Sequence, residues 1–370
     1  MTGGGAGTNS SSAPGDSATT STADGAGTVP QVAGHPMPAL LGEGTDPELV
    51  AWRERLPAHV EELLQRWELR ASAPFVPGGS SAWVAPVTDR DGAERVLKVA
   101  WAHEEARDEA AGMRAWQGRG AAALYRSERV GDTSALLLER VRPGVPLAQL
   151  LTWPERDEVL VNVAMQLWKP PSELEDAGLE NVGLEDVGLE DAGFADPQAE
   201  RAAAKDVSEH ASAPEACGFR PLAHMCAWWA DRALEEGGGE RAGLPREVVL
   251  RGLELFHTLP AGWDGEEVLL ATDLHPSNVL AGGTGSARRW VLIDPKPYVG
   301  DPHYDLLQHM FNNPERLRTA PGPFAERMAD LAGLDPVRLR RWLFARAVQE
   351  AGTMDAAAEA ALLLTADAGL

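Results

Sequence analysis

The sequence predicts an α+β fold, with a β-rich part near the N-terminus and a mostly helical part near the C-terminus. Between residues 46 and 141, apolar side chains alternate between the three- and four-residue steps of amphipathic helices and short runs rich in Val and Trp, which favour strands. From residue 324 to 370 the pattern favours helices that end in an Ala- and Leu-rich stretch. The 370 residues suffice for two or three domains with hydrophobic cores.

The β-rich part, placed at residues 46–141, is predicted as alternating helices and hairpins. An Asp-Gly pair separates the strands of the first hairpin, as is typical of a tight turn. In order, the predicted elements are a helix (46–70), two hairpin strands (81–87 and 95–101), a helix (103–118) and two further strands (122–127 and 134–141). Arg142, Pro143 and Gly144 are expected to break the chain, and residues 142–370 form the second part.

Two segments lack any such period. Residues 1–45 begin with a run of Gly, Ser, Thr and Ala that cannot bury enough surface to offset the entropy of ordering, so we expect a disordered tail. Residues 174–193 read LEDAG, LENVG, LEDVG and LEDAG, and a Gly at every fifth position fits neither helix nor strand. We therefore expect a low-complexity acidic insertion at 172–217, as a passive surface loop or as an acidic docking tract.

The formal net charge of -23 disfavours a nucleic-acid binder, because affinity for phosphates comes mostly from clustered Lys and Arg. Much of the charge lies in the predicted insertion, where thirteen carboxylates between 173 and 217 face only Arg201 and Lys205. The charge thus supports a cationic partner only weakly. Two cysteines and no apolar run of membrane-spanning length predict a cytoplasmic protein without a disulfide framework, thiolate metal site or membrane segment.

The first hairpin carries two candidate features. Gly78, Gly79, Ser80 and Ser81 form a small-residue turn at its start, where backbone amides could approach a phosphate, although an ordinary turn has the same composition. Lys98 lies between apolar neighbours in the second strand, and a cation on an inward face needs a partner. Glu109 on the following helix is the expected partner, with Glu105 next, and a surface lysine is the alternative.

The strongest signal is a strand, a polar loop and two further strands at residues 268–294. Asp273 and Asn278 lie in the loop, and Asp294 ends the last strand after a span of hairpin length, so it can return beside Asn278. Phosphoryl transfer of the kinase type needs a carboxylate near the acceptor hydroxyl and oxygen ligands for Mg²⁺. The three residues in this order therefore predict a phosphotransferase site.

Three blocks resemble the aminoglycoside phosphotransferase superfamily, and most closely its aminoglycoside/hydroxyurea resistance kinase branch, which includes streptomycin 6-phosphotransferases. They are ALLLERVRPG (135–144), LLATDLHPSNVL (269–280) and WVLIDPKPYVGDPHYDLLQHM (290–310). The resemblance implies a protein-kinase-like bilobal fold, with a β-rich nucleotide-binding N-lobe, a hinge, and a helical C-lobe that binds the acceptor. MgATP would lie in the cleft between them.

By the same resemblance, Lys98 holds the α- and β-phosphates and pairs with Glu109, Asp273 is the catalytic carboxylate, and Asn278 and Asp294 bind Mg²⁺. Leu138, Glu139 and Arg140 form the hinge, whose backbone receives the adenine. Ala271 and Thr272 stand where many relatives have His and Gly, which implies a packing change in the loop rather than a lost site.

The function implied is transfer of phosphate from ATP to a hydroxyl of a small molecule, first of all an aminoglycoside such as streptomycin. The alternatives are a kinase for hydroxyurea or an endogenous metabolite, and an inactive nucleotide-binding pseudokinase. We expect no nucleic acid, membrane or obligate protein partner. Asp301 is expected to be a helix N-cap, and Trp228 and Trp229 to be core residues, with an aromatic sugar platform as the alternative. Asp305, His275 and His309 are expected to be structural residues, with orientation of the loop or lining of the acceptor pocket as the alternative.

Overall fold

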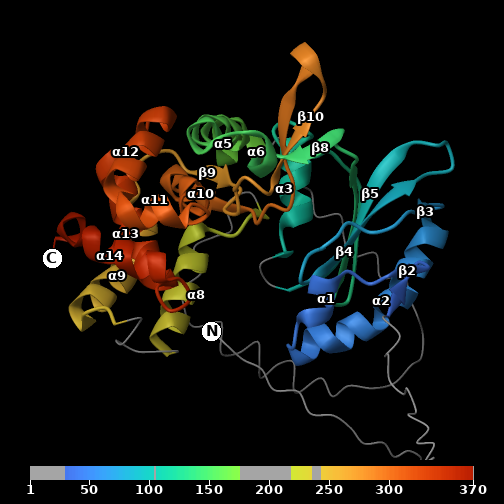
Figure 1. The fold of residues 1–370 in the computed structure, drawn as a ribbon, viewed down its shortest axis with the longest axis horizontal. Helices are drawn as coiled ribbons and strands as arrows, with labels where there is room; N and C mark the ends of the chain where they lie inside the picture. Colours follow the sequence, from blue (N-terminus) through green and yellow to red (C-terminus); the bar gives the residue numbers. More distant parts are fainter. Residues whose placement is uncertain (1–29, 104–105, 176–217, 236–242, 370) are drawn as a thin grey trace, which may run out of the picture.

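Two lobes lie side by side in the computed structural model, which describes residues 30–103, 106–175, 218–235 and 243–369 (Figure 1). The N-terminal lobe is built on one antiparallel sheet, and the C-terminal lobe consists mostly of helices. The predicted α+β class, with a β-rich N-lobe and a helical C-lobe, is confirmed.

The N-lobe sheet has five strands in the order β3-β4-β5-β7-β6. Side chains alternate across it, so Leu97 and Val99 pack towards helix α2 while Lys98 points to the opposite face. The strands are β3 (Arg70–Ala71), β4 (Ala82–Thr88), β5 (Glu94–Trp101), β6 (Leu124–Val130) and β7 (Thr133–Glu139). Both predicted hairpins are present, with strand ends shifted by at most three residues.

Regular secondary structure begins nearer the N-terminus than the sequence predicted. A short hairpin and a helical turn precede α2, and Val32, Met37 and Leu41 are buried against the α2 face of the sheet. The prediction of a disordered tail at 1–45 is therefore wrong for residues 30–45. No pattern in the sequence indicates this, because these apolar residues are isolated and do not repeat at a helical or strand spacing. Residues 1–29 lie outside the described part. The elements are β1 (Gln31–Val32), β2 (His35–Pro36), α1 (Ala39–Glu43) and α2 (Pro47–Arg66).

The link between the lobes differs from the predicted break. Pro143, after Arg142, begins strand β8 (Pro143–Pro146), which pairs with β10 of the C-terminal lobe. This pairing joins residues far apart in the sequence, so no local pattern reveals it. Helix α3 (Glu109–Trp116) is shorter than the predicted helix at 103–118.

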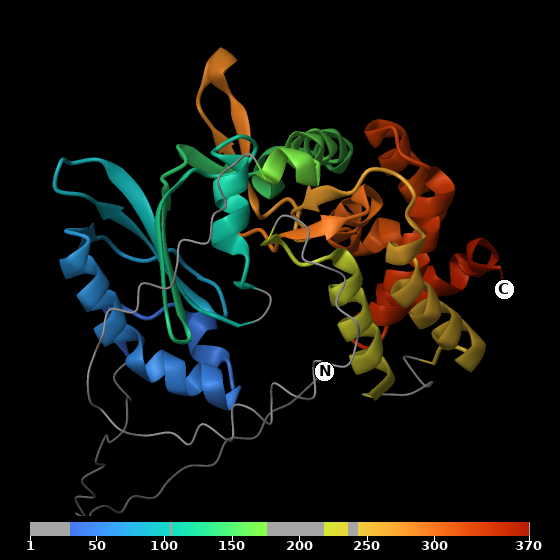
Figure 2. The ribbon, with the colours of Figure 1, turned by 180° about the vertical axis from the view of Figure 1, so that it is seen from behind.

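The C-terminal lobe places two small sheets beside a group of packed helices (Figure 2). One sheet has the order β11-β10-β8, and β9 pairs with β12. Apart from β8, the strands of these two sheets are β9 (Val268–Leu270), β10 (Val279–Gly282), β11 (Arg289–Leu292) and β12 (Tyr298–Gly300). Its helices are α4 (Leu147–Leu150), α5 (Trp153–Leu167), α6 (Pro171–Glu175), α8 (Leu222–Glu235), α9 (Arg246–Thr258), η3 (Pro260–Gly262), η4 (Gly285–Ala287), η5 (Pro302–Leu306), α10 (Leu307–Phe311), α11 (Pro314–Thr319), α12 (Pro321–Ala332), α13 (Pro336–Glu350), α14 (Asp355–Leu363) and η6 (Thr365–Ala368).

The expected insertion at 172–217 begins later than predicted. Residues up to Glu175 belong to α6, and Leu174 is fully buried in the C-terminal core. The rest of the insertion, including most of the repeat, lies outside the described residues. None of the helices in the described ranges has the length and apolar character needed to cross a bilayer.

The hydrophobic cores do not divide at residue 141. Met113 and Trp116 of α3, with Leu136 and Leu138 of β7, pack into the same core as the C-terminal helices. The other core lies between α2 and the opposite face of the sheet. Helix α3 is therefore attached to the C-terminal lobe as well as to the sheet.

Candidate active site

Lys98 lies at the centre of the candidate site, on the face of β5 turned towards α3. Its Nζ is 2.7 Å from both carboxylate oxygens of Glu109, so the expected pair is present, while Glu105 lies outside the described residues. Burial alone would lower the pKa of Lys98, but the charges of Asp294 and Glu109 raise it above its usual value. Burial raises the pKa of Glu109 to about 6, against the effect of the Lys98 charge. The lysine is therefore charged and held between carboxylates.

A close approach of α3 to the C-terminal lobe fixes the position of Glu109. Gly112 lies so near Pro297 that a Cβ at this position would come within 2.3 Å of the proline Cγ. Trp116 Nε1 donates a hydrogen bond of 2.9 Å to the carbonyl oxygen of Leu167 in α5. Only glycine fits at residue 112, so the sequence allows α3 to sit directly on the loop that follows Asp294.

The β10–β11 hairpin brings Asn278 and Asp294 together. Val279 pairs with Leu292, and the Ile293 amide donates to the Asn278 carbonyl over 2.8 Å. The two candidate metal ligands therefore flank the open end of one hairpin, as their spacing predicted.

Asn278 also ties the hairpin to Asp273. Its Nδ2 donates to the Asp273 backbone carbonyl at 3.2 Å and approaches Asp273 Oδ2 at 3.3 Å. The backbone N–H of Asn278 donates a hydrogen bond of 3.0 Å to the His275 carbonyl oxygen, which closes the turn of the loop. The amide oxygen of Asn278 accepts no hydrogen bond from the residues that the structure describes.

Asp294 connects the two lobes. Its Oδ1 lies 2.6 Å from Lys98 Nζ, and the carboxylate is about half exposed. Chiefly the charge of Lys98 lowers the pKa of Asp294, so the group is ionised at neutral pH. The Asp294 backbone has a φ of 56°, a left-handed conformation that is rare for residues other than glycine. Such strained geometry is common at functional sites.

Asp305 binds the backbone of the loop that begins at Ala271. It is fully buried and accepts hydrogen bonds from the amides of Ala271 (3.2 Å) and Thr272 (2.7 Å) and from Trp168 Nε1 (3.0 Å). Burial raises the pKa of Asp305 to about 6, and these hydrogen bonds oppose the shift. The predicted structural role of Asp305 is confirmed, because these hydrogen bonds hold the backbone of the loop at Ala271 and Thr272.

Two basic side chains lie near Asp273. Lys296 Nζ is 3.7 Å from Asp273 Oδ2, and His275 Nε2 is 3.8 Å from Asp273 Oδ1. Burial raises the pKa of Asp273, while Lys296 and His275 lower it. Burial also lowers the pKa of His275, which favours the neutral imidazole. Asp273 is thus a partly buried carboxylate with a raised proton affinity, as suits a general base.

A cavity of about 180 Å³ opens beside Asp273. Helices α8, η5, α10 and α13 contribute Met225, Trp229, Tyr304, Gln308, Arg346, Gln349 and Glu350 to its wall, and Thr272, Lys296 and Tyr298 come from the chain between β9 and the start of β12. The prediction of a core position is wrong for Trp228, which is 46 % exposed, whereas Trp229 packs against the C-terminal core and also lines this cavity. The sequence could not show this, because both lie on one apolar helix whose outer face is not covered by any described element.

The predicted phosphate turn lies between β3 and β4. Gly78 has a φ of 85°, and a Cβ there would come within 2.5 Å of Pro38 Cβ, so the turn rests on the N-terminal segment. Gly79 and Ser80 are exposed, and Ser81 Oγ is 3.5 Å from His103 Nε2. The turn is therefore open for a ligand, and its contact with phosphate stays a prediction.

The predicted hinge lies where β7 ends and the chain crosses to β8. The Glu139 amide donates to the Ala123 carbonyl over 2.8 Å, and the Glu139 carboxylate pairs with Arg289 of β11. The Arg140 guanidinium stacks 4.6 Å from the Phe75 ring centroid, and burial lowers the pKa of Arg140. The segment thus joins both lobes, and adenine binding by its backbone stays a prediction.

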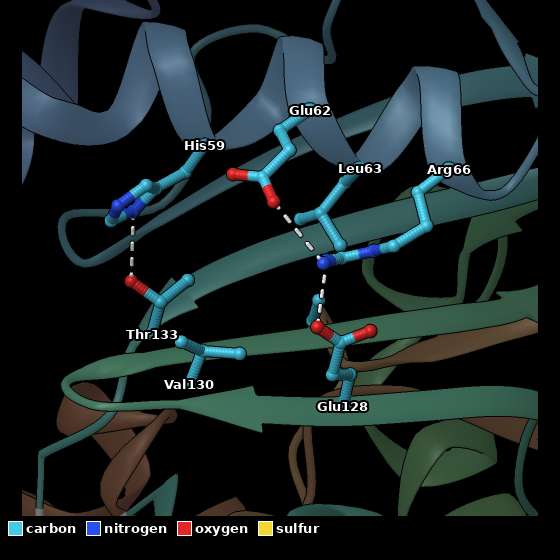
Figure 3. A pocket seen from close by; sticks show the side chains of 8 residues that line it. His59, Glu62, Leu63, Arg66, Glu128, Val130 and Thr133 are labelled. Carbon is cyan, nitrogen blue, oxygen red and sulfur yellow. Dashed lines mark hydrogen bonds and ion pairs between the residues drawn. The ribbon is translucent and has the colours of Figure 1, made fainter. Parts of the chain in front are cut away.

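A second cavity, of about 90 Å³, lies between α2 and the β6–β7 hairpin (Figure 3). Arg66 bridges Glu62 (3.2 Å) and Glu128 (2.7 Å) there, and His59 Nδ1 is 3.2 Å from Thr133 Oγ1. This cavity faces the side of the sheet opposite Lys98. Its polar groups are satisfied by one another, so it is not the active site.

The sequence matches a known family over most of the described residues. The model of the aminoglycoside/hydroxyurea antibiotic resistance kinases matches residues 66–217 and 195–357, which is more than half of the chain. The chain belongs to this family. It is therefore a small-molecule phosphotransferase that uses a hydroxyl group as acceptor.

Two curated proteins illustrate the relationship. The kinase is 33 % identical over 297 residues to the hydroxyurea phosphotransferase of Kitasatospora aureofaciens, covering 80 % of this chain and 72 % of that protein. It is 29 % identical over 324 residues to the streptomycin 6-kinase of Streptomyces glaucescens, covering 85 % and 88 %. Among solved structures, aminoglycoside phosphotransferase APH(4)-Ia in complex with ADP and hygromycin B is similar at a TM-score of 0.46 and 19 % identity, covering 84 % of this chain and 97 % of that one.

The oxygen atoms of Asn278 and Asp294 fit a divalent cation of the Mg²⁺ type. Lys98 occupies only Oδ1 of Asp294, so Oδ2 and the Asn278 amide oxygen accept no hydrogen bond within the described residues. Two protein oxygens are the usual share for Mg²⁺ in a kinase, since phosphate oxygens and water complete the octahedron. No group of three or more His, Cys, Asp or Glu side chains in the described part could hold a metal by itself. The site therefore suits a metal that arrives with a phosphate ligand.

Proposed function

We propose that this kinase transfers the γ-phosphate of MgATP to a hydroxyl group of a small antibiotic-like molecule. One observation carries the proposal: Lys98 Nζ lies 2.7 Å from the Glu109 carboxylate and 2.6 Å from the Asp294 carboxylate. These contacts join the N-lobe sheet, α3 and the segment that follows β11 at one point. This arrangement places a cation between the buried carboxylate of Glu109 and the candidate metal ligand Asp294, which the β10–β11 hairpin brings close to Asn278. The chemistry of phosphoryl transfer requires such a set.

The nucleotide side of the reaction is assigned as follows. Lys98 binds the α- and β-phosphates, and Glu109 holds its ammonium in place. The backbone amides of Gly78, Gly79, Ser80 and Ser81 approach the phosphates, and the backbone at Glu139 and Arg140 receives the adenine. Asn278 and Asp294 would hold Mg²⁺, and the ion would supply neutralisation of charge on the transferring phosphoryl group.

On the acceptor side, Asp273 orients the hydroxyl and takes its proton. The acceptor oxygen forms a bond to the γ-phosphorus while the bond from that phosphorus to the bridging oxygen of ADP breaks. Lys296, 3.7 Å from Asp273, is close enough to stabilise the ionised carboxylate before the proton arrives. Asn278 keeps Asp273 in position through its side-chain amide.

For the acceptor, we propose an aminoglycoside such as streptomycin first and hydroxyurea second. The two named relatives, a hydroxyurea phosphotransferase and a streptomycin 6-kinase, support these two compounds. A pseudokinase is disfavoured, because the described residues bring Lys98, Asp273, Asn278 and Asp294 together. We infer a cytoplasmic reaction, since ATP is available there and Cys226 is a free thiol. No protein or nucleic-acid partner is needed.

The test is ADP release from the purified full chain with MgATP and a panel of streptomycin, other aminoglycosides, hydroxyurea and small alcohols. Mass spectrometry of the products locates the phosphate. We expect acceptor-dependent ADP release above the rate with water alone. The absence of release with every acceptor, for a protein that still binds MgATP, would overturn the proposal in favour of the pseudokinase.

A further inference from the structure

Arg346 is a buried cation in the wall of the cavity beside Asp273. Only 9 % of the residue is exposed, yet its Nε and Nη1 are enclosed without a hydrogen-bond partner in the described part of the chain. Its Nη2 donates to Gln308 Oε1 and lies 3.8 Å from Glu350 Oε1, which is too long for a hydrogen bond. The guanidinium is thus incompletely paired inside the protein.

The surroundings of Arg346 do not explain why a charge is kept there. Its guanidinium lies 5.0 Å and 5.5 Å from the ring centroids of Phe311 and Tyr304, so its faces contact aromatic rings. A buried cation with few hydrogen bonds lowers stability relative to an apolar side chain of similar size. Such a residue in the wall of a substrate cavity is better explained by a ligand than by packing.

The charges around the cavity indicate the kind of ligand. Lys296 and Arg346 contribute two positive charges, and Asp273 and Glu350 contribute two negative charges, of which Asp273 is reserved for the reacting hydroxyl. The polar end formed by Gln308, Arg346, Gln349 and Glu350 therefore has no excess negative charge. A guanidinium donates hydrogen bonds and accepts none, so it recognises an oxygen and repels a cation.

On the basis of the proposed function, we propose that Arg346 determines acceptor specificity by donating a hydrogen bond to a carbonyl or carboxylate oxygen of the acceptor. The second N–H of Nη2, beside Gln308 and Glu350, is the donor that a ligand in the cavity reaches. The acceptor therefore carries its hydroxyl at the Asp273 end and an uncharged or anionic oxygen at the Arg346 end. A molecule with a cationic group at that end is excluded.

The experiment compares Arg346→Met and Arg346→Lys with the wild-type chain and with Arg341→Met, an exposed position on the same helix. Acceptor-dependent ADP release is measured with hydroxyurea (neutral carbonyl), a hydroxycarboxylate such as lactate (anionic) and streptomycin (cationic). Binding of each compound without ATP is followed by tryptophan fluorescence, since Trp229 lines the cavity.

We expect Arg346→Met to raise the KM or Kd of the carbonyl or carboxylate compound about 10- to 100-fold, while the KM for ATP changes less than about twofold. Arg346→Lys should recover part of the loss, and Arg341→Met should behave as wild type. Because a buried and only partly paired charge is removed, Arg346→Met should melt no lower than the wild-type chain, whereas a structural role for Arg346 predicts a lower melting temperature.

The outcomes separate the two proposals. Turnover with unchanged acceptor KM in Arg346→Met, or use of streptomycin by the wild-type chain that does not change when the charge is removed, overturns the role of Arg346 and leaves the proposed function intact. Arg346-dependent binding without turnover overturns the proposed function and supports the role of Arg346. Neither binding nor turnover of any compound overturns both.

Discussion

Lys98 Nζ lies 2.6 Å from Asp294 Oδ1, a contact that spans the two lobes and 196 positions of sequence. The ammonium thus neutralises one oxygen of a candidate metal ligand and leaves the other available. Both groups stay charged, because each shifts the pKa of the other in the direction that favours ionisation. This pair is the reference point for the predictions on the nucleotide side.

Replacing Lys98 by Met should lower kcat/KM for ATP about 10²- to 10³-fold, because a charge that contacts the phosphates is lost. Arg90→Met, at a well-exposed position in the same sheet region, is the control and should have no effect. Steady-state kinetics with varied ATP checks this. Unchanged kinetics in Lys98→Met would show that the lysine does not bind the nucleotide.

Asp273→Asn should lower kcat about 10²- to 10⁴-fold with little change in MgATP affinity, since the variant keeps the shape of the loop but cannot take a proton. The pH profile gives a second readout. Because burial raises the pKa of Asp273, wild-type activity should fall as the pH decreases through that pKa, and this acidic limb should vanish in the variant. A variant with near-wild-type kcat contradicts the assignment.

Trp229→Ala should raise the KM for the acceptor about tenfold and leave the KM for ATP unchanged, because the ring lines the cavity beside Asp273. Trp228→Ala is a matched control on the same helix, where the ring is 46 % exposed. Equal effects of the two substitutions on the acceptor KM would place the acceptor elsewhere.

Gly78→Ala should destabilise the protein more than Gly92→Ala does. Both glycines have φ above 80°, so each substitution adds about 1–2 kcal/mol of backbone strain. Only at Gly78 does the new Cβ also meet Pro38, whereas nothing lies within 4 Å at Gly92. Urea unfolding of both variants measures the difference in unfolding free energy. Equal decreases in the two variants would mean that the segment around Pro38 moves away from the new Cβ without cost.

The stability contribution of Asp305 should decrease as the pH rises from 4 to 6. Its pKa is about 6 in the folded chain and near 3.8 in the unfolded chain, so the folded chain holds a proton that the unfolded chain has released in this window. Compared with Asp305→Asn, the wild-type chain should lose about 3 kcal/mol of unfolding free energy across it. Urea titrations at both pH values check this, and parallel pH dependences would contradict the shift.

The sequence predicted best what depends on local spacing. The hairpin strands around Lys98 follow from Val- and Trp-rich runs, and the return of Asp294 beside Asn278 follows from the length of one hairpin. Helix α3 was predicted too long at both ends: it runs only from Glu109 to Trp116, and the chain leaves the helix at Gln117, whose φ of 52° is left-handed.

Features that depend on contacts between distant residues could not be predicted. The packing of Val32 and Leu41, the pairing of β8 with β10 and the place of Trp229 in the cavity are set by partners far away in the sequence. Arg346 gave no signal either, since an arginine on an amphipathic helix is normally exposed. Its burial appears only when α13 packs against η5 and α10.

The seating of α3 on Pro297 bears on how the enzyme begins to work. Glu109 belongs to a helix whose inner side is part of the C-terminal core, so moving it away from Lys98 would require opening that core. The pair is therefore preorganised, and none of the free energy of substrate binding is spent on assembling it. We expect full activity from the first turnover after mixing, without a lag and without an activating modification.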